Sequence, residues 1–148
     1  MFTLKLNWIA IVVAALVSVL LEAVWFSIFM IPWLAGLGIT RDWLLDVAAI
    51  APATQYGIAL LCSFVAATIL SLLTHMTGPQ TARRGILIAL LVWTGFVATN
   101  WASEYAFEVR SFQIYFINTG YFLLDLILMG AITGGWKSKP SARQHQGT

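Results

Sequence analysis

Residues 8–32 read WIAIVVAALVSVLLEAVWFSIFMIP, and this stretch decides the fold class. Glu22 is its single charged residue. A helix needs about 20 consecutive apolar residues to cross the hydrocarbon core of a bilayer, whereas the apolar core of a signal peptide is only about 7–15 residues long. The stretch therefore predicts a transmembrane helix that is retained in the protein.

The rest of the chain has the same apolar character. Of its 148 residues, 60% are apolar and only 9% are charged, whereas a soluble domain typically carries about 25% charged residues. We therefore predict an all-α, polytopic membrane protein, a four-transmembrane-helix bundle that forms a single domain over residues 1–136. Its spans are expected at about 7–31, 52–76, 84–103 and 113–136, and residues 137–148 are expected to form a polar tail.

The basic residues predict how the bundle is oriented. Four spans place the N-terminus, the second loop and the C-terminus on one side of the membrane. That side carries six of the eight basic residues, namely Lys5, Arg83, Arg84, Lys137, Lys139 and Arg143. Because cytoplasmic loops are enriched in Lys and Arg, we expect a multi-pass protein of the cell inner (cytoplasmic) membrane. Both termini, and with them the polar tail, are then cytoplasmic.

Several classes of ligand have no support in the sequence. Cys62 is the single cysteine, so an intrachain disulfide is excluded. His75 has no companion ligand in a fixed position, since the other histidine lies in the polar tail, and metal sites need several ligands in a defined geometry. We expect no metal, no cofactor and no nucleic-acid partner, and membrane lipid as the surroundings of the bundle.

Two acids lie inside the predicted spans. Glu22 shares a helix face with Ser18, and Asp125 shares one with Tyr121 and Asn118, at spacings of three or four residues. Acids inside membrane spans are costly and usually face protein or water. One hypothesis is a proton- or cation-binding pair in the bundle interior. The alternative is that each acid is protonated and forms structural hydrogen bonds between helices.

Small residues recur at four-residue spacing in two of the spans. Gly130 and Gly134 form a GxxxG motif in the last span. The second span carries the series Ala59, Ser63, Ala67 and Ser71. Small residues at this spacing let helix backbones approach closely inside a membrane. We interpret both series as helix-packing positions within one bundle, with a homodimer or partner-helix interface at the GxxxG motif as the alternative.

A polar group is predicted near the loop before the last span. It consists of Asn100, Glu104, Glu108 and Arg110. We interpret the group as a loop held by an exposed salt bridge, which contributes about 0–1 kcal/mol. The alternative is a small polar pocket on the outer face, where an enzyme acting on lipid would have its site.

Several segments resemble a bacterial family of small, four-helix integral membrane proteins of unknown function. The matching segments are Asn7-Trp8, Trp25-Phe26-Ser27, Trp93–Thr99, Phe107-Glu108, Arg110-Ser111, Ile117–Tyr121 and Met129–Ile132. This resemblance covers nearly the whole chain and implies the same four-helix topology, but it implies no activity. Glu22 and Asp125 stand where the family pattern leads us to expect small or apolar residues, which favours a role particular to this protein.

Three functional hypotheses follow. We favour a non-enzymatic accessory or scaffold subunit that associates with itself or with a larger membrane complex. The alternative is a small proton-coupled transporter or channel that uses Glu22 and Asp125. The weaker alternative is an intramembrane enzyme that acts on lipid.

Overall fold

The protein is helical throughout the part of the chain that the structure describes. The computed structural model describes residues 6–47 and 51–136. Helices make up 87% of the structure, and the described residues form no β-strand. Within these described ranges, four candidate spans are long and apolar enough to cross a membrane. The predicted all-α class with four membrane-length helices is therefore confirmed, while the side of the membrane on which the termini lie stays a prediction.

The first span is interrupted near its end. Helix α1 (Trp8–Ile28) begins after Asn7, whose side-chain oxygen accepts a hydrogen bond from a backbone amide of the first turn at 3.2 Å. It ends four residues before Pro32, because a proline lacks the N–H that would bond to the carbonyl four residues earlier. The chain resumes as α2 (Met30–Leu37), which ends at Gly38 in the left-handed conformation (φ 70°).

The second span starts and stops at residues that suit helix ends. A short helix, α3 (Arg41–Val47), precedes it. Helix α4 (Pro52–Met76) carries Pro52 in its first turn, where the missing N–H is not needed. The tight turn after α4 contains Gly78, whose φ of 130° lies in a region that favours glycine.

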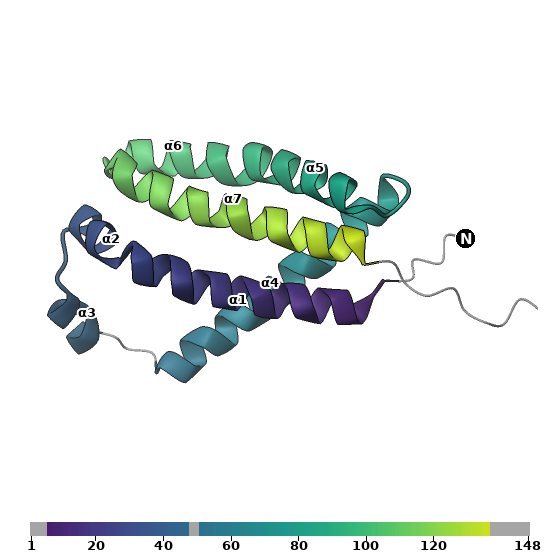
Figure 1. Cartoon of the computed structure of the whole chain (residues 1–148). Coiled ribbons are helices and arrows are strands. Elements are labelled where there is room, and N and C mark those ends of the chain that lie inside the picture. The colour runs from purple at the N-terminus through teal and green to yellow at the C-terminus, as the bar shows by residue number, and fades with distance from the viewer. Residues whose placement is uncertain (1–5, 48–50, 137–148) are drawn as a thin grey trace, which may run out of the picture.

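The third and fourth spans form an antiparallel hairpin. The third runs from Ala82 to Phe107 and consists of α5 (Ala82–Val92), the π-helical turn η1 (Trp93–Ala98) and α6 (Thr99–Phe107). The fourth is α7 (Phe112–Gly135), capped by the Ser111 side chain. Figure 1 shows the two spans side by side along their length.

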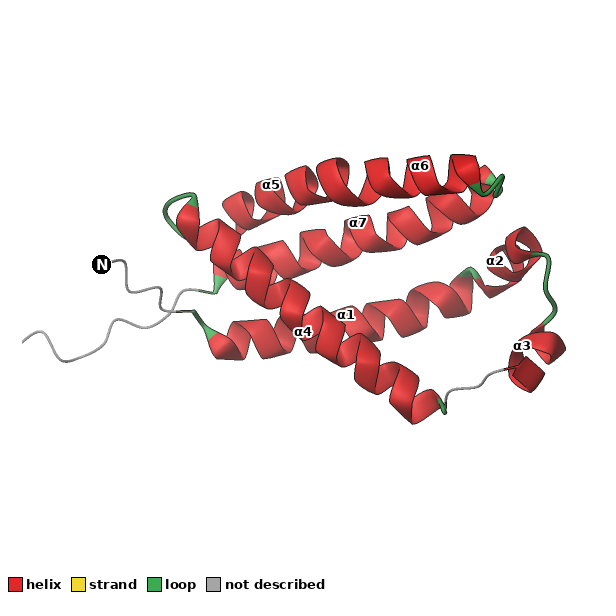
Figure 2. Ribbon diagram, turned by 180° about the vertical axis from the view of Figure 1, so that it is seen from behind, coloured by secondary structure: helices red, strands yellow, loops and turns green. Residues whose placement is uncertain are grey.

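Helix α7 lies at the centre of the arrangement. It contacts α1, α2, α4, α5 and α6. Figure 1 shows α1 and the α5–α6 span on either side of α7, and Figure 2 shows α4 crossing the bundle obliquely. We call the end that bears Asn7 and Trp136 the termini end, where the Asn7 side-chain amide donates to the Trp136 carbonyl at 3.1 Å. The other end, with α2, α3 and the turn before α7, is the opposite end.

The tightly packed core lies toward the termini end. Its members are buried apolar residues from α1, α4, α5 and α7, namely Ile11, Ala14, Ala67, Leu70, Ala89 and Met129. Here the α5 and α7 backbones touch, since a Cβ on Gly85 would overlap the Gly130 carbonyl, and one on Gly130 would overlap the Gly85 carbonyl. Small residues thus bring these two helices together.

The predicted boundaries of the spans and of the tail can be compared with the helices that the structure describes. The fourth predicted span, 113–136, and α7 differ by one residue at each end, whereas the first span is divided into α1 and α2. The predicted polar tail, 137–148, lies outside the described residues. The same is true of Lys5, so of the basic residues predicted at the termini end only Arg83 and Arg84 are described.

Candidate functional site

The two membrane acids project from facing helices into one region of the interior. Glu22 lies on α1 and Asp125 on α7, two helices that pack against each other. Asp125 is only 6% exposed, and Glu22 is half-buried. Neither acid forms an ion pair within the described residues. Both acids lie close to Tyr121, at the contact between α1 and α7.

A pair of hydroxyl groups connects the surroundings of Asp125 to a third helix. The Ser18 hydroxyl lies 2.9 Å from the Ser63 hydroxyl of α4, and it also interacts with the side chains of Asp125 and Tyr121. One oxygen of Asp125, Oδ1, has no hydrogen-bond partner among the described residues. We call these five residues, Ser18, Glu22, Ser63, Tyr121 and Asp125, the polar cluster.

The polar cluster has the parts needed to bind and release a proton. A serine hydroxyl is both donor and acceptor, and it rotates to suit its neighbours. The Ser18 hydroxyl, which bonds Ser63, is therefore able to adjust to either protonation state of the neighbouring Asp125. A buried carboxylate without a basic partner is costly, so this network is suited to a carboxyl group that changes its protonation state.

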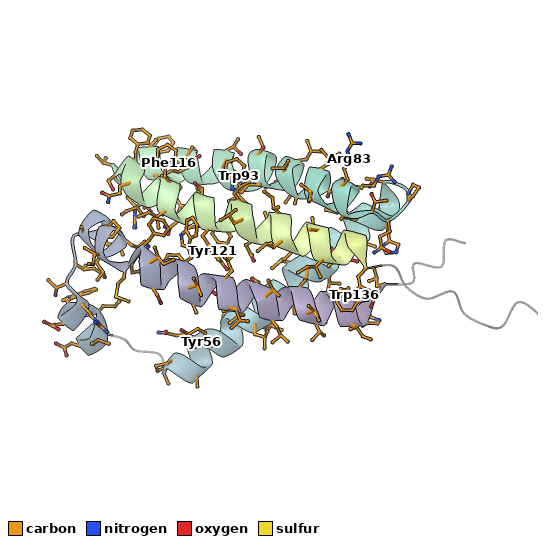
Figure 3. The ribbon with its side chains drawn as sticks, in the orientation of Figure 1. Tyr56, Arg83, Trp93, Phe116, Tyr121 and Trp136 are labelled. Atoms are coloured by element: carbon orange, nitrogen blue, oxygen red, sulfur yellow. The ribbon has the colours of Figure 1, made fainter. Side chains whose placement is uncertain are left out.

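Aromatic rings enclose the cluster toward the opposite end. The Phe26 ring packs against Tyr121, with centroids 5.6 Å apart, and against Trp33 in an edge-to-face contact at 5.6 Å. Figure 3 shows Tyr121 in the space between α1 and α7. The acids thus lie between the apolar core on one side and a layer of aromatic rings on the other.

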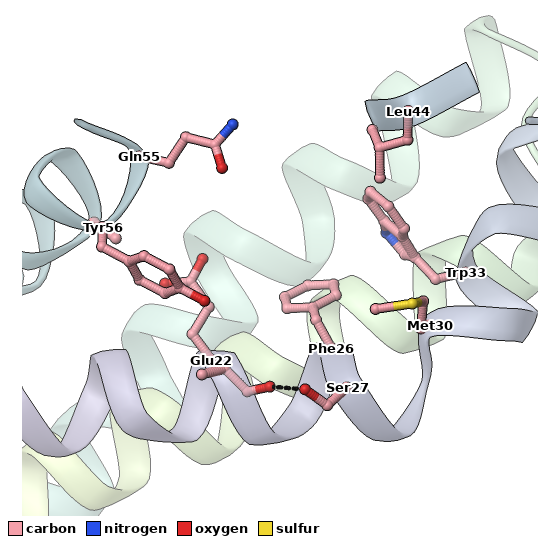
Figure 4. A pocket seen from close by; sticks show the side chains of 10 residues that line it. Glu22, Phe26, Ser27, Met30, Trp33, Leu44, Gln55 and Tyr56 are labelled. Carbon is pink, nitrogen blue, oxygen red and sulfur yellow. Dashed lines mark hydrogen bonds between the residues drawn. The ribbon is translucent and has the colours of Figure 1, made fainter. Parts of the chain in front are cut away.

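A cavity adjoins Glu22 where α4 diverges from α1. It has a volume of about 400 Å³ and is lined by residues of α1, α2, α3 and α4, including Glu22, Phe26, Met30, Trp33, Gln55 and Tyr56. Figure 4 shows the Glu22 and Tyr56 side chains projecting into it at one end, and Trp33 and Leu44 at the other. Glu22 therefore joins the polar cluster to a ligand-sized space.

Indole N–H groups fasten neighbouring helices to α7. Trp25 donates to the Ile117 carbonyl at 3.0 Å, and Trp93 donates to the Thr119 carbonyl at 2.8 Å. Trp93 begins the π-helical turn, a feature often found at functional sites. The place of Trp93 against α7 is visible in Figure 3.

Asn118 belongs to a separate chain of hydrogen bonds near the opposite end. Its oxygen accepts from the Trp33 indole at 3.2 Å, and its amide group donates to the Tyr105 hydroxyl at 2.8 Å. The chain ties α2, α6 and α7 to one another. Asn118 was predicted to share the face of Asp125 as a proton-site candidate, and the structure gives it these two structural partners.

The polar group predicted on the outer face is spread over α6 and the turn that follows. Glu108 and Arg110 form an ion pair in which both side chains are 42% exposed. Asn100 instead donates to the Phe96 carbonyl of its own helical segment at 2.7 Å, and Glu104 is exposed. A cavity of about 460 Å³ lies beside Arg110.

The small residues lie at helix contacts. A Cβ on Gly130 or Gly134 would meet the backbone of Gly85 or Thr81, so the GxxxG motif faces the start of the third span. Ser63, Ala67 and Ser71 are buried, whereas Ala59 lines the cavity. His75 bonds the carbonyl of Ser71 in its own helix, and Cys62 is exposed.

Sequence reasoning missed the residues that α4 contributes. Ser63 was assigned to helix packing, yet its hydroxyl bonds Ser18. Tyr56 and Gln55 were not singled out, although both line the cavity. One signal was available, because Gln55 and Tyr56 are polar or amphipathic residues that follow Pro52 at the start of an apolar span. The sequence does not indicate the angle at which α4 crosses the bundle, and this angle places Gln55 and Tyr56 at the cavity.

Comparison with known proteins places the chain without assigning it an activity. A family model described as "Protein of unknown function (DUF1761)" matches residues 9–134. No curated protein matches the chain. No solved structure matches it either.

Proposed function

The chain belongs to this family of unknown function, DUF1761, and we propose that it is a small proton-coupled transporter that binds its proton at Glu22 and Asp125. The observation that carries the proposal is the polar cluster, in which Ser18 and Ser63 accompany the two acids without a basic residue. Ionisable residues inside membrane spans commonly mark proton relays and substrate pathways.

The surroundings of the cluster support a site with access from one end. The cavity reaches Glu22 from the side of α2 and α3. Toward the termini end, the buried core around Ile11, Leu70 and Met129 separates the cluster from that end of the bundle. A transporter exposes its site to one side at a time, and this structure corresponds to a state open toward the opposite end.

We place this transporter in the cell inner membrane, with both termini in the cytoplasm. Arg83 and Arg84 lie at the termini end, whereas Asp42, Asp46 and Glu104 lie toward the opposite end. Enrichment of basic residues on the cytoplasmic side supports this orientation. The cavity then opens toward the extracytoplasmic side.

Proton flux in liposomes tests the proposed function. Purified protein is reconstituted with a pH-sensitive dye inside, and a pH gradient is imposed. Glu22→Gln and Asp125→Asn keep the side-chain shape but cannot release a proton, so each is expected to abolish protein-dependent flux. Glu104→Gln removes an exposed acid outside the cluster and serves as the matched control. Equal flux in all four proteins, or none in any, would contradict the proposal.

A second candidate function is that of an accessory subunit, which associates with itself or with a larger membrane complex. It is favoured by the first two turns of α4, where residues 52–58 are all exposed. A side chain at Gly57 would meet nothing within 4 Å. A glycine in a membrane helix permits close approach of another helix, so a partner helix, or a second copy of this chain, has room to dock there.

Purification from the native membrane tests this second function. A gentle detergent extract is captured through a tag, and the proteins that accompany it in fixed stoichiometry are identified by mass spectrometry. A partner that is lost in Gly57→Leu and kept in Gly95→Leu, another glycine facing open space, would support the accessory role. A chain that emerges as a monomer without partners would contradict it.

A further inference from the structure

The cavity between α1, α2, α3 and α4 has two chemically different ends. Glu22, Tyr56 and Gln55 gather at one end, and Met30, Trp33 and Leu44 at the other. A volume of about 400 Å³ lies within the usual range of small-molecule sites, about 300–1,000 Å³. The occupant suited to such a cavity is amphipathic, with a polar group near Glu22 and an apolar body near Trp33.

The charge of the lining residues indicates whether the ligand is a cation or an anion. Glu22 is the charged side chain among the described lining residues. Helix α3, which contributes Leu44 to the wall, carries Asp42 and Asp46 beside a single Arg41. The surroundings of the cavity are therefore acidic on balance, and they favour a cation over an anion.

The aromatic residues narrow the ligand class further. Phe26, Trp33 and Tyr56 all line the cavity together with Glu22, and Figure 4 shows the Tyr56 side chain at the same end of the cavity as Glu22. Aromatic faces attract cations, and they attract alkylated ammonium groups in particular. A carboxylate and aromatic rings that line one cavity provide both the charge and the ring faces to hold such a group.

We propose that this cavity binds an organic cation, an ammonium group that carries an apolar body, with the ammonium between Glu22, Phe26 and Tyr56 and the apolar body against Trp33, Met30 and Leu44. The proposal rests on the proposed transport function, since it names the substrate of the same site. Before the cation binds, Glu22 is a protonated carboxyl group; the bound cation displaces this proton to solvent, and the carboxylate that remains balances the charge of the cation. Binding of one cation thus releases one proton.

Fluorescence anisotropy titration of the protein in detergent tests the ligand class. The probe is trimethyl(naphthylmethyl)ammonium, and naphthylmethanesulfonate, with the same aromatic body and the opposite charge, is the control ligand. We expect the cation to bind saturably and the sulfonate not to bind. Equal binding of both probes, or binding of neither, would overturn the proposal.

Variants distinguish binding of the probe at the cavity from partitioning of the probe into detergent micelles. Glu22→Gln is expected to weaken cation binding at least about 10-fold, because the opposite charge is lost in a partly buried site. Tyr56→Leu is expected to weaken it by about threefold through loss of the ring face. Tyr56 is 52% exposed, so this variant does not threaten folding. Unchanged affinity in both variants would contradict the proposal, and Glu104→Gln is the control expected to bind as the unaltered protein does.

Proton release distinguishes failure of this inference from failure of the proposed function. The cation is added to the protein in weakly buffered solution, and the pH change is recorded. Cation binding that releases about one proton, and that is lost in Glu22→Gln, supports both proposals. Glu22-dependent proton flux in liposomes without cation binding would overturn the ligand class alone. Cation binding without proton release would overturn proton coupling and the exchange step, while the cation site itself would stand.

Discussion

The two ends of the bundle are held together by different means. Toward the termini end, glycines and small apolar residues bring α5 and α7 into backbone contact, and the core is closed. Toward the opposite end, hydroxyl, amide and indole groups bridge the helices, and α4 diverges to leave a cavity. In a membrane, where no hydrophobic effect drives helices together, close packing and interhelical hydrogen bonds are the two available means. In this protein, close packing holds the termini end together, and interhelical hydrogen bonds surround the candidate site.

The largest expected effect comes from breaking the close-packed end. Gly130→Leu places a side chain against the Gly85 backbone, and overpacking of this kind costs about 3 kcal/mol. We expect a marked fall in the melting temperature of the protein in detergent, measured by circular dichroism. Gly57→Leu is the matched control, since its side chain meets open space. Similar melting temperatures for the two variants would show that the α5–α7 contact is not what closes this end.

A smaller effect is expected at the polar cluster. Ser18→Ala removes the hydroxyl that bonds Ser63, and such interhelical bonds contribute about 0.6 kcal/mol on average and at most about 1.7 kcal/mol. Ser63→Ala should cost a similar amount, and the double variant little more than either single one. Equilibrium unfolding of the three variants in mixed micelles measures the coupling. In Ser27→Ala, the control, the lost hydroxyl bonds its own helix, to the Ala23 carbonyl. Strictly additive costs would show that Ser18 and Ser63 act independently.

The indole bonds to α7 sharpen the same comparison. Trp93→Phe keeps an aromatic ring but loses the N–H that donates to the Thr119 carbonyl, at an expected cost of about 1 kcal/mol. The exposed Trp43 of α3 offers the control Trp43→Phe, which should leave stability unchanged. Thermal unfolding of both proteins measures the difference. Equal stability of the two variants would show that the Trp93 indole bond does not stabilise the contact between the π-helical turn and α7.

The smallest effect is expected at the exposed ion pair. Glu108→Gln removes the partner of Arg110 on a turn where both side chains are 42% exposed. The loss should be about 0–1 kcal/mol and should shrink as salt is added, because exposed pairs are screened. A loss as large as that in Gly130→Leu, measured in the same unfolding assay, would mean that this turn stabilises the bundle in a way its exposure does not indicate.

Hydropathy and helix breakers made the fold predictable. Long apolar segments separated by Pro52, Gly78 and charged turns lead directly to four membrane-length helices. The spacing of Gly130 and Gly134 also pointed to close packing, because small residues four apart share a helix face. These features are local, so a single sequence contains them.

The candidate site depends on features that are not local. The sequence places Glu22 beside Ser18, and Asp125 beside Tyr121, but the rotation and depth of α1 relative to α7 decide whether the two pairs meet. Helix α4 packs against α1 and α7 near Ser63 and Ala67 and diverges toward Tyr56, where the cavity lies. Its own sequence does not specify this crossing angle. The π-helical turn at Trp93 likewise had no marker in the residue pattern.

Infrared spectroscopy of the carboxyl groups tests the central claim most directly. A protonated carboxyl has a carbonyl stretching band that a carboxylate lacks, so difference spectra recorded across a pH titration show which acids gain or lose a proton. We predict a reversible carboxyl band that loses separate components in Glu22→Gln and Asp125→Asn and is unchanged in Glu104→Gln. Spectra that are the same in the unaltered protein and in both cluster variants would contradict the claim that these two acids exchange protons.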